Sequence, residues 1–319
     1  MLRSLKLPVI FLLGPTASGK TEWAIEWQKL FNCIEIISVD SVMVYQGCDV
    51  GSAKPTTKIL TKHPHHLINV AVLDQIFSVA NFCQKAHQMI EEIHSRDNLP
   101  LLVGGSMMYF NVLKKGMNSL PNADLNFRAG LQMRIQQDGI TSLYEELSVL
   151  DEEIASLIKP QDTQRIIRAL EITHLSSSAE PTKEKDLLQL SLAEKYTLHQ
   201  YGIFPSDRSV LHKRIANRQH EMMKGDLLLK EVQNLNAQYN LAPDHPAMKA
   251  VNYRQALQVL NGELSKNDLF EKSLYATRQL AKRQITWMRS WEDLNTFDIN
   301  EFDEATKHLK KQLNFGGTL

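Results

Sequence analysis

The sequence of 319 residues predicts an α/β protein in which helices flank a parallel sheet and an all-helical insertion interrupts it. Three observations support this prediction. Up to about residue 120, continuous apolar runs alternate with helical patterns, as expected of strands buried on both faces. A long stretch then shows only helical periodicity, and a strand pattern returns near residue 197. Hydrophobic residues make up 43% of the chain, which is enough for a substantial core.

The first part of the chain predicts three strands with helices between them. Apolar runs predict strands at Leu7–Leu13, Ile34–Val39 and Leu101–Val103, the last of which is followed by two glycines. Apolar residues at helical spacing predict helices at Glu22–Leu30 and Phe77–Ile93. Buried strands separated by helices are typical of a parallel sheet that is covered on both faces.

The rest of the chain predicts a helical insertion and then a return to the sheet. We expect residues 123–195 to form the insertion, because they contain only helical patterns, broken by Pro160 and by a polar stretch. Tyr196–Phe204 predicts a further strand, and Leu269–Trp291 predicts a long helix. The predicted core domain therefore combines residues 1–122 with residues 196–319.

Composition and charge exclude several classes of protein. The chain has 36 basic and 36 acidic residues, but the expected insertion is acidic and the segments on either side are basic, which allows a local basic surface. Three cysteines without a paired spacing indicate a reducing compartment, so we expect a cytoplasmic protein. No apolar run approaches the roughly 18 residues of a membrane span. The apolar run after Lys6 continues into a glycine loop, which argues against a signal peptide.

A phosphate-binding loop is predicted between the first strand and the first helix. There the sequence reads Gly14-Pro15-Thr16-Ala17-Ser18-Gly19-Lys20-Thr21, which fits G-x-x-x-x-G-K-[ST]. The glycines let the backbone aim N–H groups at an anion, and the helix that follows adds its positive end. Lys20 adds a mobile cation, and the Thr21 hydroxyl can hold Mg²⁺. The motif predicts a P-loop NTPase-like core that binds a phosphate or diphosphate group.

Polar residues also follow the two neighbouring strands. Asp40 ends the second strand and should face the phosphate loop, because carboxyl ends of parallel strands line the ligand crevice. Its carboxylate could be an indirect Mg²⁺ ligand, a general base or a cap for the next segment. Ser106 follows the third strand and could act in catalysis or cap the next helix. His63, His65 and His66 lie in an expected loop without a partner cysteine, so we expect no zinc there.

Two basic helix faces are predicted outside the sheet. In the long C-terminal helix, Arg278, Lys282 and Arg289 fall within roughly 40° of one another at about 100° per residue. In the insertion, Arg165 and Arg168 share one face. Two basic faces around a phosphate-binding core indicate a nucleic-acid clamp, with a solvated charged face as the alternative. We expect three apolar residues to anchor the opposite side of the C-terminal helix: Leu280, Trp287 and Trp291.

Several short motifs follow the phosphate loop in order. They are Ser38–Ser41, Val44–Gly47, Gly51–Pro55, Pro64–Leu67, Leu102–Gly105, Arg168–Glu171, Asn252–Arg254 and Arg278–Trp287. In these motifs the chain resembles the bacterial tRNA isopentenyltransferase family, and the resemblance runs from about Pro8 to Trp291.

The resemblance implies prenyl transfer to tRNA, and we expect a monomeric enzyme without a membrane partner. The dimethylallyl group would move from dimethylallyl diphosphate to the exocyclic amine of the adenosine on the 3′ side of the anticodon. It implies that residues 14–21 and Arg218 hold the diphosphate, with Mg²⁺ on Thr21 as the cofactor. Asp40 would accept a proton from the amine. The implied catalytic residues are Lys20, Asp40, Ser106 and Arg218.

The resemblance also implies a set of residues that contact tRNA and that includes residues of both basic faces. A base that must reach a buried donor would leave its stack. The implied contact residues are Asp40, Ser41, Val42, Met43, Ser106, Arg128, Gln164, Arg165, Ile166, Ile167, Arg168, Lys249, Ala250, Val251, Asn252, Tyr253, Arg254, Lys282, Arg283, Gln284, Ile285, Thr286, Trp287, Met288 and Arg289.

Three positions depart from the family pattern, and two other functions compete. Ser52 and Ser106 stand where threonine is usual, and Asn252 stands where glycine is usual. A nucleoside or nucleotide kinase that uses ATP on the same loop is the main alternative. An RNA-binding protein with a degenerate nucleotide site is the other, and the presence of Lys20, Thr21 and Asp40 argues against it.

Overall fold

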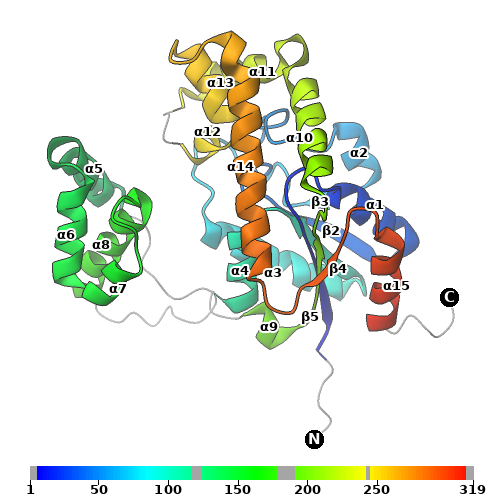
Figure 1. Cartoon of the computed structure of the whole chain (residues 1–319). Helices are drawn as coiled ribbons and strands as arrows, with labels where there is room; N and C mark the ends of the chain where they lie inside the picture. The colour runs from blue at the N-terminus through cyan, green and yellow to red at the C-terminus, as the bar shows by residue number, and fades with distance from the viewer. Residues whose placement is uncertain (1–5, 117–123, 179–190, 242–244, 314–319) are drawn as a thin grey trace, which may run out of the picture. The chain divides into compact units, whose positions relative to one another are not determined.

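The computed structural model describes residues 6–116, 124–178, 191–241 and 245–313, and the chain divides into two compact units (Figure 1). The larger unit contains residues 1–116 and 191–319, and the smaller unit contains residues 117–190. The insertion was expected to continue to residue 195. Instead α9 (Leu192–Lys195) belongs to the larger unit, where it leads directly into a strand of the sheet.

A parallel sheet of six strands forms the centre of the larger unit. The four strands that the sequence predicts are present, and a further strand was missed at each edge. His65 and His66 belong to one of these edge strands, so the expectation of a loop there was wrong. Strands of two or three residues are too short to show a period. The sheet order β3-β2-β4-β1-β5-β6 is formed by β1 (Pro8–Leu13), β2 (Ile34–Val39), β3 (His65–His66), β4 (Leu99–Gly104), β5 (Thr197–Ile203) and β6 (Asn295–Phe297).

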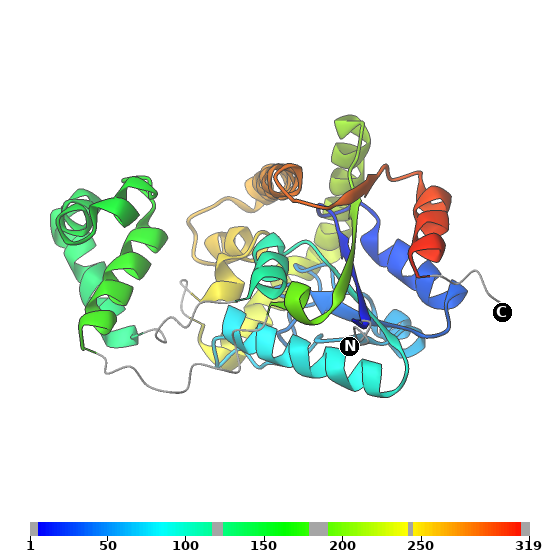
Figure 2. The same cartoon turned by 90° about the horizontal axis from the view of Figure 1, so that it is seen from below.

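Helices cover both faces of this sheet and extend beyond it (Figure 2). The predicted helices at the phosphate loop, before β4 and near the C-terminus are all present. The helix before β4 starts two residues later than predicted, because the Ser78 side chain caps it by accepting the N–H of Asn81. Besides α9, the described helices of this unit are α1 (Lys20–Leu30), α2 (Thr57–Lys62), α3 (Val79–Ser95), α4 (Met107–Lys115), α10 (Arg208–Met223), η1 (Lys224–Asp226), α11 (Leu227–Tyr239), α12 (Pro246–Lys249), α13 (Tyr253–Leu260), η2 (Lys266–Asp268), α14 (Leu269–Arg289) and α15 (Phe302–Gln312).

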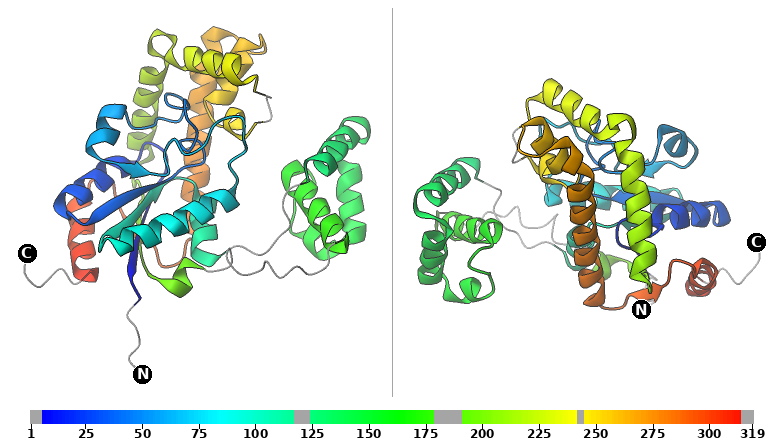
Figure 3. Two further views of the ribbon diagram at one scale, coloured as in Figure 1. Left: turned by 180° about the vertical axis from the view of Figure 1, so that it is seen from behind. Right: turned by 45° about the horizontal axis from the view of Figure 1, so that its top comes forward.

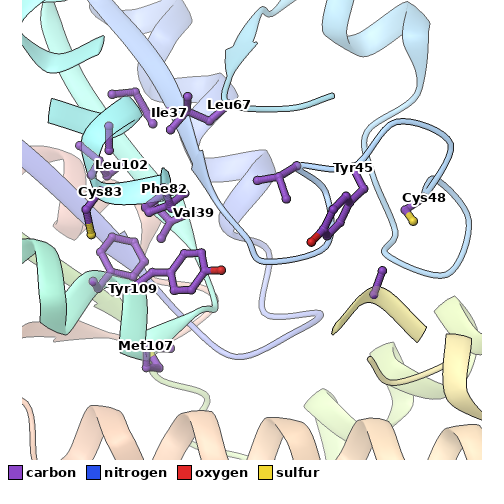
Figure 4. Packing of buried hydrophobic residues seen from close by; sticks show 14 of the residues in the cluster. Ile37, Val39, Tyr45, Cys48, Leu67, Phe82, Cys83, Leu102, Met107 and Tyr109 are labelled. Atoms are coloured by element: carbon purple, nitrogen blue, oxygen red, sulfur yellow. The ribbon is translucent and has the colours of Figure 1, made fainter. Parts of the chain in front are cut away.

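The strand period of two divides the core between the two faces. Phe11 points to the face covered by α3 and α4, where the rings of Phe82 and Tyr109 lie with centroids 4.6 Å apart (Figure 4). Leu12 points to the other face, where it shares a cluster with Trp27 of α1 and with residues of α15. The central strands are therefore buried on both sides, as their continuous apolar runs predict.

The smaller unit is helical throughout its described part (Figure 3). Leu143, Leu147, Ile166 and Leu170 form its own buried core. None of the described helices in either unit is long and apolar enough to cross a membrane. The helices of the smaller unit are α5 (Leu125–Asp138), α6 (Ile140–Leu150), α7 (Glu152–Ser156) and α8 (Thr163–Ser178).

The register of the sheet brings three loops to one edge. Gly104 at the end of β4 pairs with both Leu13 at the end of β1 and Val39 at the end of β2. A Cβ atom on Gly104 would lie 2.0 Å from the carbonyl oxygen of Val39, so only glycine allows this approach. The phosphate loop, Asp40 and Ser106 follow these strands and therefore lie at the same edge.

Candidate active site

The phosphate loop has the backbone shape that an anion site needs. Ala17 and Gly19 have φ values of 62° and 99°, which turn the chain sharply before α1 begins at Lys20. The first N–H groups of α1 and its positive end therefore face the loop. The Ser18 hydroxyl is fully buried and has no hydrogen-bond partner among the described residues. This combination is typical of a site for phosphate oxygens.

Three cations lie against this loop. Lys20 Nζ donates to the carbonyl of Pro15 at 2.7 Å, and the Arg218 guanidinium donates to Thr16 Oγ1 at 3.0 Å. Arg214, one turn before Arg218 on α10, reaches the carbonyl of Ser18 at 3.5 Å. A role was predicted for Arg218 but not for Arg214, although their spacing of four residues predicts a shared helix face.

The electrostatics of the loop favour an anion. Burial, together with the nearby Arg218, lowers the pKa of Lys20 to about 7, although Asp40 opposes the shift. Burial also lowers the pKa of Arg218. A bound anion would offset both the burial of these cations and their mutual repulsion.

Asp40 and Ser106 lie beside each other across from the loop. Asp40 Oδ1 accepts the N–H groups of Val42 and Met43 at 2.8 and 3.1 Å, so the carboxylate caps the next segment. Its second oxygen has no hydrogen-bond partner among the described residues and remains available. Ser106 is the N-cap residue of α4, but its Oγ accepts the N–H of Ser41 at 3.2 Å and makes no capping hydrogen bond to α4. Of the two alternatives for Ser106, the side-chain cap is therefore not observed.

A cavity of about 990 Å³ joins these groups. Its size is at the upper end of small-molecule sites, which allows more than one group to bind side by side. Polar residues of the phosphate loop, Asp40, Ser106, Arg214 and Arg218 contribute to its lining. The apolar lining is formed by Met43, Val103, Met107, Met108, Leu280 and Trp287 among others.

One amide connects α14 to two of the loops. Gln284 Oε1 accepts the N–H of Thr16 at 2.8 Å, and its Nε2 donates to the carbonyl of Gly105 at 2.9 Å. Only 7% of Gln284 is exposed, so both bonds are shielded from water. A Cβ atom on Gly105 would lie 2.4 Å from Nε2, so a larger residue there would displace the Gln284 amide from this position. Both polar ends of the Gln284 amide are therefore hydrogen-bonded within the protein.

Asn252 has the backbone conformation that explains why glycine is usual at this position. Its φ and ψ are 75° and −50°, a strained region for any residue with a side chain. The side chain offsets this strain, since Nδ2 donates to the carbonyl of Gly51 at 2.9 Å and Oδ1 accepts from Gln219 at 3.0 Å. Asn252 thereby ties the cavity wall at Gly51 to the helix that carries Arg218.

The buried face of α14 differs from the predicted one. Trp287 is 40% exposed, and together with Leu280 it lines the cavity instead of anchoring the helix. Trp291 does pack, and its Nε1 donates to Gln200 Oε1 at 2.8 Å. Small and polar side chains allow the close packing of α14 on its neighbours, whereas the predicted face was based on the positions of large apolar residues. The packed face carries Leu274, Thr277, Ala281, Gln284, Ile285 and Met288.

Several side chains that were expected to contact tRNA are in the core. Ile166 and Ile167 are buried in the smaller unit, and Ile285 and Met288 are buried in the larger one. These four residues lie inside contiguous motif segments, where helical periodicity sends every third or fourth side chain inward. A contact with tRNA at these four positions would therefore involve the backbone, and it remains a prediction. The fully buried Tyr253 also has a structural contact, since its hydroxyl donates to Glu231 at 2.7 Å.

In the smaller unit, the structure gives two predicted RNA-contact arginines a structural role. Arg128 donates to both oxygens of Glu171, at 2.8 and 2.7 Å, and Arg168 donates to the same carboxylate. The Glu171 side chain is fully buried. Burial alone would raise the pKa of Glu171, but the hydrogen bonds from Arg128 and Arg168 lower it. The more exposed Arg165 keeps most of its surface accessible.

Replacing Glu171 with glutamine is expected to destabilise the smaller unit by about 3 kcal/mol, because two arginines lose their buried partner. Hydrogen exchange along α5 and α8 would measure this loss. The control is Glu146→Gln, since the Glu146 pair with Arg134 is 37% and 44% exposed and should contribute less than about 1 kcal/mol. Equal stability of the two variants would contradict a structural role for Glu171.

The donor groups of the cavity fit Mg²⁺ bound mainly through a ligand. The Thr21 hydroxyl and the available Asp40 oxygen both line the cavity, and hard oxygen ligands are those that Mg²⁺ prefers. Within the described ranges, no three acidic, histidine or cysteine side chains form a metal-binding group. Mg²⁺ often binds in this way, through one or two protein oxygens and the phosphates of a substrate.

Comparison with known proteins agrees with this geometry. The model of the IPP transferase family matches residues 43–291. The tRNA isopentenylpyrophosphate transferase of Bacillus halodurans is 31% identical, with a TM-score of 0.68 over 97% of this chain and 96% of its own. The tRNA delta(2)-isopentenylpyrophosphate transferase of Staphylococcus epidermidis is 31% identical, with a TM-score of 0.66 over 96% of this chain and all of its own. A eukaryotic dimethylallyltransferase acting on tRNA shares the fold, with a TM-score of 0.69 at 21% identity over 95% of this chain and 78% of its own.

Proposed function

The chain belongs to the IPP transferase family of prenyl-transferring enzymes, and we propose that it moves a dimethylallyl group from dimethylallyl diphosphate to tRNA. The acceptor is the exocyclic amine of the adenosine on the 3′ side of the anticodon. The products are N6-isopentenyladenosine in the tRNA and free diphosphate.

One observation carries this proposal. A single cavity combines an anion-binding loop, three cations and a carboxylate with an extensive apolar lining. A kinase site must hold a phosphate acceptor beside the nucleotide, whereas a prenyl donor needs an apolar surface beside its diphosphate. The methionines and Trp287 of this cavity supply such a surface.

The proposed reaction is a displacement at the first carbon of the dimethylallyl group. A bond forms between this carbon and the amine nitrogen, and the bond from the carbon to the diphosphate oxygen breaks. The diphosphate leaves with the electron pair, and Asp40 accepts the proton from the amine through its available oxygen. An adenine amine is a weak nucleophile, so its orientation and its proton transfer both matter.

Departure of the diphosphate is assisted by the residues around the phosphate loop. Lys20, Arg214 and Arg218 lie against the loop, so they are placed to neutralise the charge that develops on the leaving oxygen. Thr21, with the phosphates, would hold Mg²⁺, which would supply further charge neutralisation. The Ser106 hydroxyl lies beside Ser41 and Asp40, where it can help to orient the incoming base.

The RNA substrate must deliver its base into this cavity. A base that is stacked in an anticodon loop cannot reach a donor at the edge of the sheet, so we propose that it is extruded. The exposed half of α14 carries Lys282, Arg283 and Arg289 and offers cations to RNA phosphates. The smaller unit offers Arg165 in the same way.

Affinity for dimethylallyl diphosphate is expected to fall as the pH rises above 7. The pKa of Lys20 is about 7 without ligand, and the bound anion raises it, so binding takes up a proton above that pH. The dissociation constant should increase by up to about tenfold per pH unit between roughly pH 7 and pH 9. Titration calorimetry across this range checks it. In Lys20→Arg, where the cation stays protonated, the slope should vanish, and a flat profile for the original protein would contradict the assignment.

The proposal is tested directly with purified protein, labelled dimethylallyl diphosphate, Mg²⁺ and an anticodon stem-loop. The label should enter the RNA at the adenosine next to the anticodon, as located by nuclease digestion. A parallel reaction with labelled ATP and nucleosides tests the kinase alternative and should give no phosphorylated product. Phosphoryl transfer without prenyl transfer would overturn the proposal.

A further inference from the structure

A second cavity, of about 630 Å³, lies between α13 and α14 and is lined mainly by residues outside the site described above. It borders the large cavity, because Val251 and Arg283 contribute to both. We call it the α13–α14 pocket. Its lining includes Arg254, Lys272, Tyr275 and the amides of Gln258 and Gln279.

The charge of the α13–α14 pocket favours an anionic ligand. Arg254, Lys272 and Arg283 contribute three cations, and Glu263 is the only carboxylate among its lining residues. The described structure records no ion pair for any of these three cations. They therefore remain available for the phosphate groups of a ligand.

The pocket also offers an aromatic surface and hydrogen-bonding groups. Tyr275 is 65% exposed, which is unusual for a large aromatic side chain on a packed helix. The side chains of Gln258 and Gln279 have no hydrogen-bond partner among the described residues. A ring for stacking, amides that can pair with a base edge and cations for the backbone are together typical of a site for an unpaired nucleotide.

We propose that the α13–α14 pocket binds the unpaired nucleotide that adjoins the target adenosine in the RNA. Its base stacks on Tyr275, Gln258 and Gln279 contact its edge, and Lys272 and Arg254 contact its phosphates. Arg283, at the border of the two cavities, lies between this nucleotide and the extruded adenosine. This inference rests on the proposed function, and it adds a position at which the enzyme discriminates among RNA sequences.

Binding of three stem-loops to the full chain tests the pocket. One stem-loop is intact, and the others have an abasic nucleotide on the 5′ or the 3′ side of the adenosine. Tyr275→Ala should weaken binding of the intact RNA about tenfold, and Tyr275→Phe, which keeps the ring, should change it less than about twofold. The original protein should bind one of the two abasic RNAs about tenfold more weakly than it binds the intact RNA. Tyr275→Ala should bind that abasic RNA as tightly as the original protein does.

Lys272→Ala provides a second, independent measurement. The logarithm of RNA affinity falls linearly with the logarithm of salt concentration, and in this variant the slope should be less steep by about one or less. Its matched control is Lys307→Ala, an exposed lysine of α15 on the other side of the sheet, which should leave the slope unchanged. An acidic peptide that competes with RNA for the pocket while both abasic RNAs bind normally would assign the pocket to a protein partner and overturn the inference.

The outcomes separate this inference from the proposed function. Suppose that the original protein transfers the prenyl group, and that Tyr275→Ala binds each of the three RNAs as tightly as the original protein does. The pocket assignment is then wrong, and the proposed function stands. An equal loss on all three RNAs would also overturn the pocket assignment, because the ring would then act on something other than the neighbouring base. If the original protein neither binds nor modifies the stem-loop, the proposed function itself fails. Equal melting temperatures of the two Tyr275 variants exclude misfolding as the cause.

Discussion

Asp40→Asn is expected to reduce the rate of prenyl transfer in a single turnover by roughly 10²–10⁴-fold, the usual share of acid–base catalysis. Asparagine keeps the oxygen that accepts the N–H groups of Val42 and Met43, so the loop after β2 should hold its shape. It replaces the available carboxylate oxygen with an amide that cannot accept a proton at neutral pH. Affinity for dimethylallyl diphosphate should stay unchanged.

The same variant distinguishes a general base from an indirect Mg²⁺ ligand. Donor affinity is measured at several Mg²⁺ concentrations beside single-turnover transfer. In one outcome, the variant loses much of its donor affinity, and high Mg²⁺ restores both donor binding and transfer. This outcome would favour the metal role and overturn the base assignment. Asp40→Ala removes the backbone hydrogen bonds as well, so any further loss that it shows measures the contribution of the cap.

Lys20→Ala is expected to lower prenyl transfer by about two orders of magnitude, which corresponds to roughly 3 kcal/mol of lost stabilisation of the leaving diphosphate. Donor binding should weaken as well, because the ammonium group lies against the phosphate loop. Rapid-quench transfer assays and donor titrations measure the two effects separately.

A lysine on the same helix provides the control for Lys20. Lys29 is exposed and paired with Glu26 near the other end of α1, so Lys29→Ala should leave transfer and donor binding unchanged. Turnover of Lys20→Ala at the rate of the original protein would rule out the phosphate-loop assignment. Equal losses in both variants would instead indicate damage to α1.

The sequence predicts the centre of the fold well because its central strands are buried on both faces. Continuous apolar runs identify β1 and β2, and the loops that follow them must then lie at one edge of the sheet. The position of Asp40 across from the phosphate loop follows from this topology alone. The edge strand at His65 is too short to show any period, and only its pairing with β2 defines it.

The side-chain contacts of the site were harder to predict. The face that α14 buries is set by small and polar residues such as Ala281 and Gln284, which a projection of apolar residues does not identify. The bridge from Gln284 to Thr16 joins positions that are 268 residues apart, so no local pattern indicates it. The role of Arg128 likewise depends on the buried Glu171, a partner on another helix.

The contacts of Asn252 have an evolutionary consequence. A chain with glycine at this position has the required backbone freedom but no side chain to bind Gln219 and the carbonyl of Gly51. A chain with asparagine gains both bonds and accepts a narrower range of conformations. Codons for the two residues differ at more than one nucleotide, so a lineage passes from one to the other through aspartate or serine. Aspartate keeps an oxygen for Gln219 and tolerates positive φ, but it has no donor for the carbonyl of Gly51, so both intermediates lose hydrogen bonds that asparagine makes.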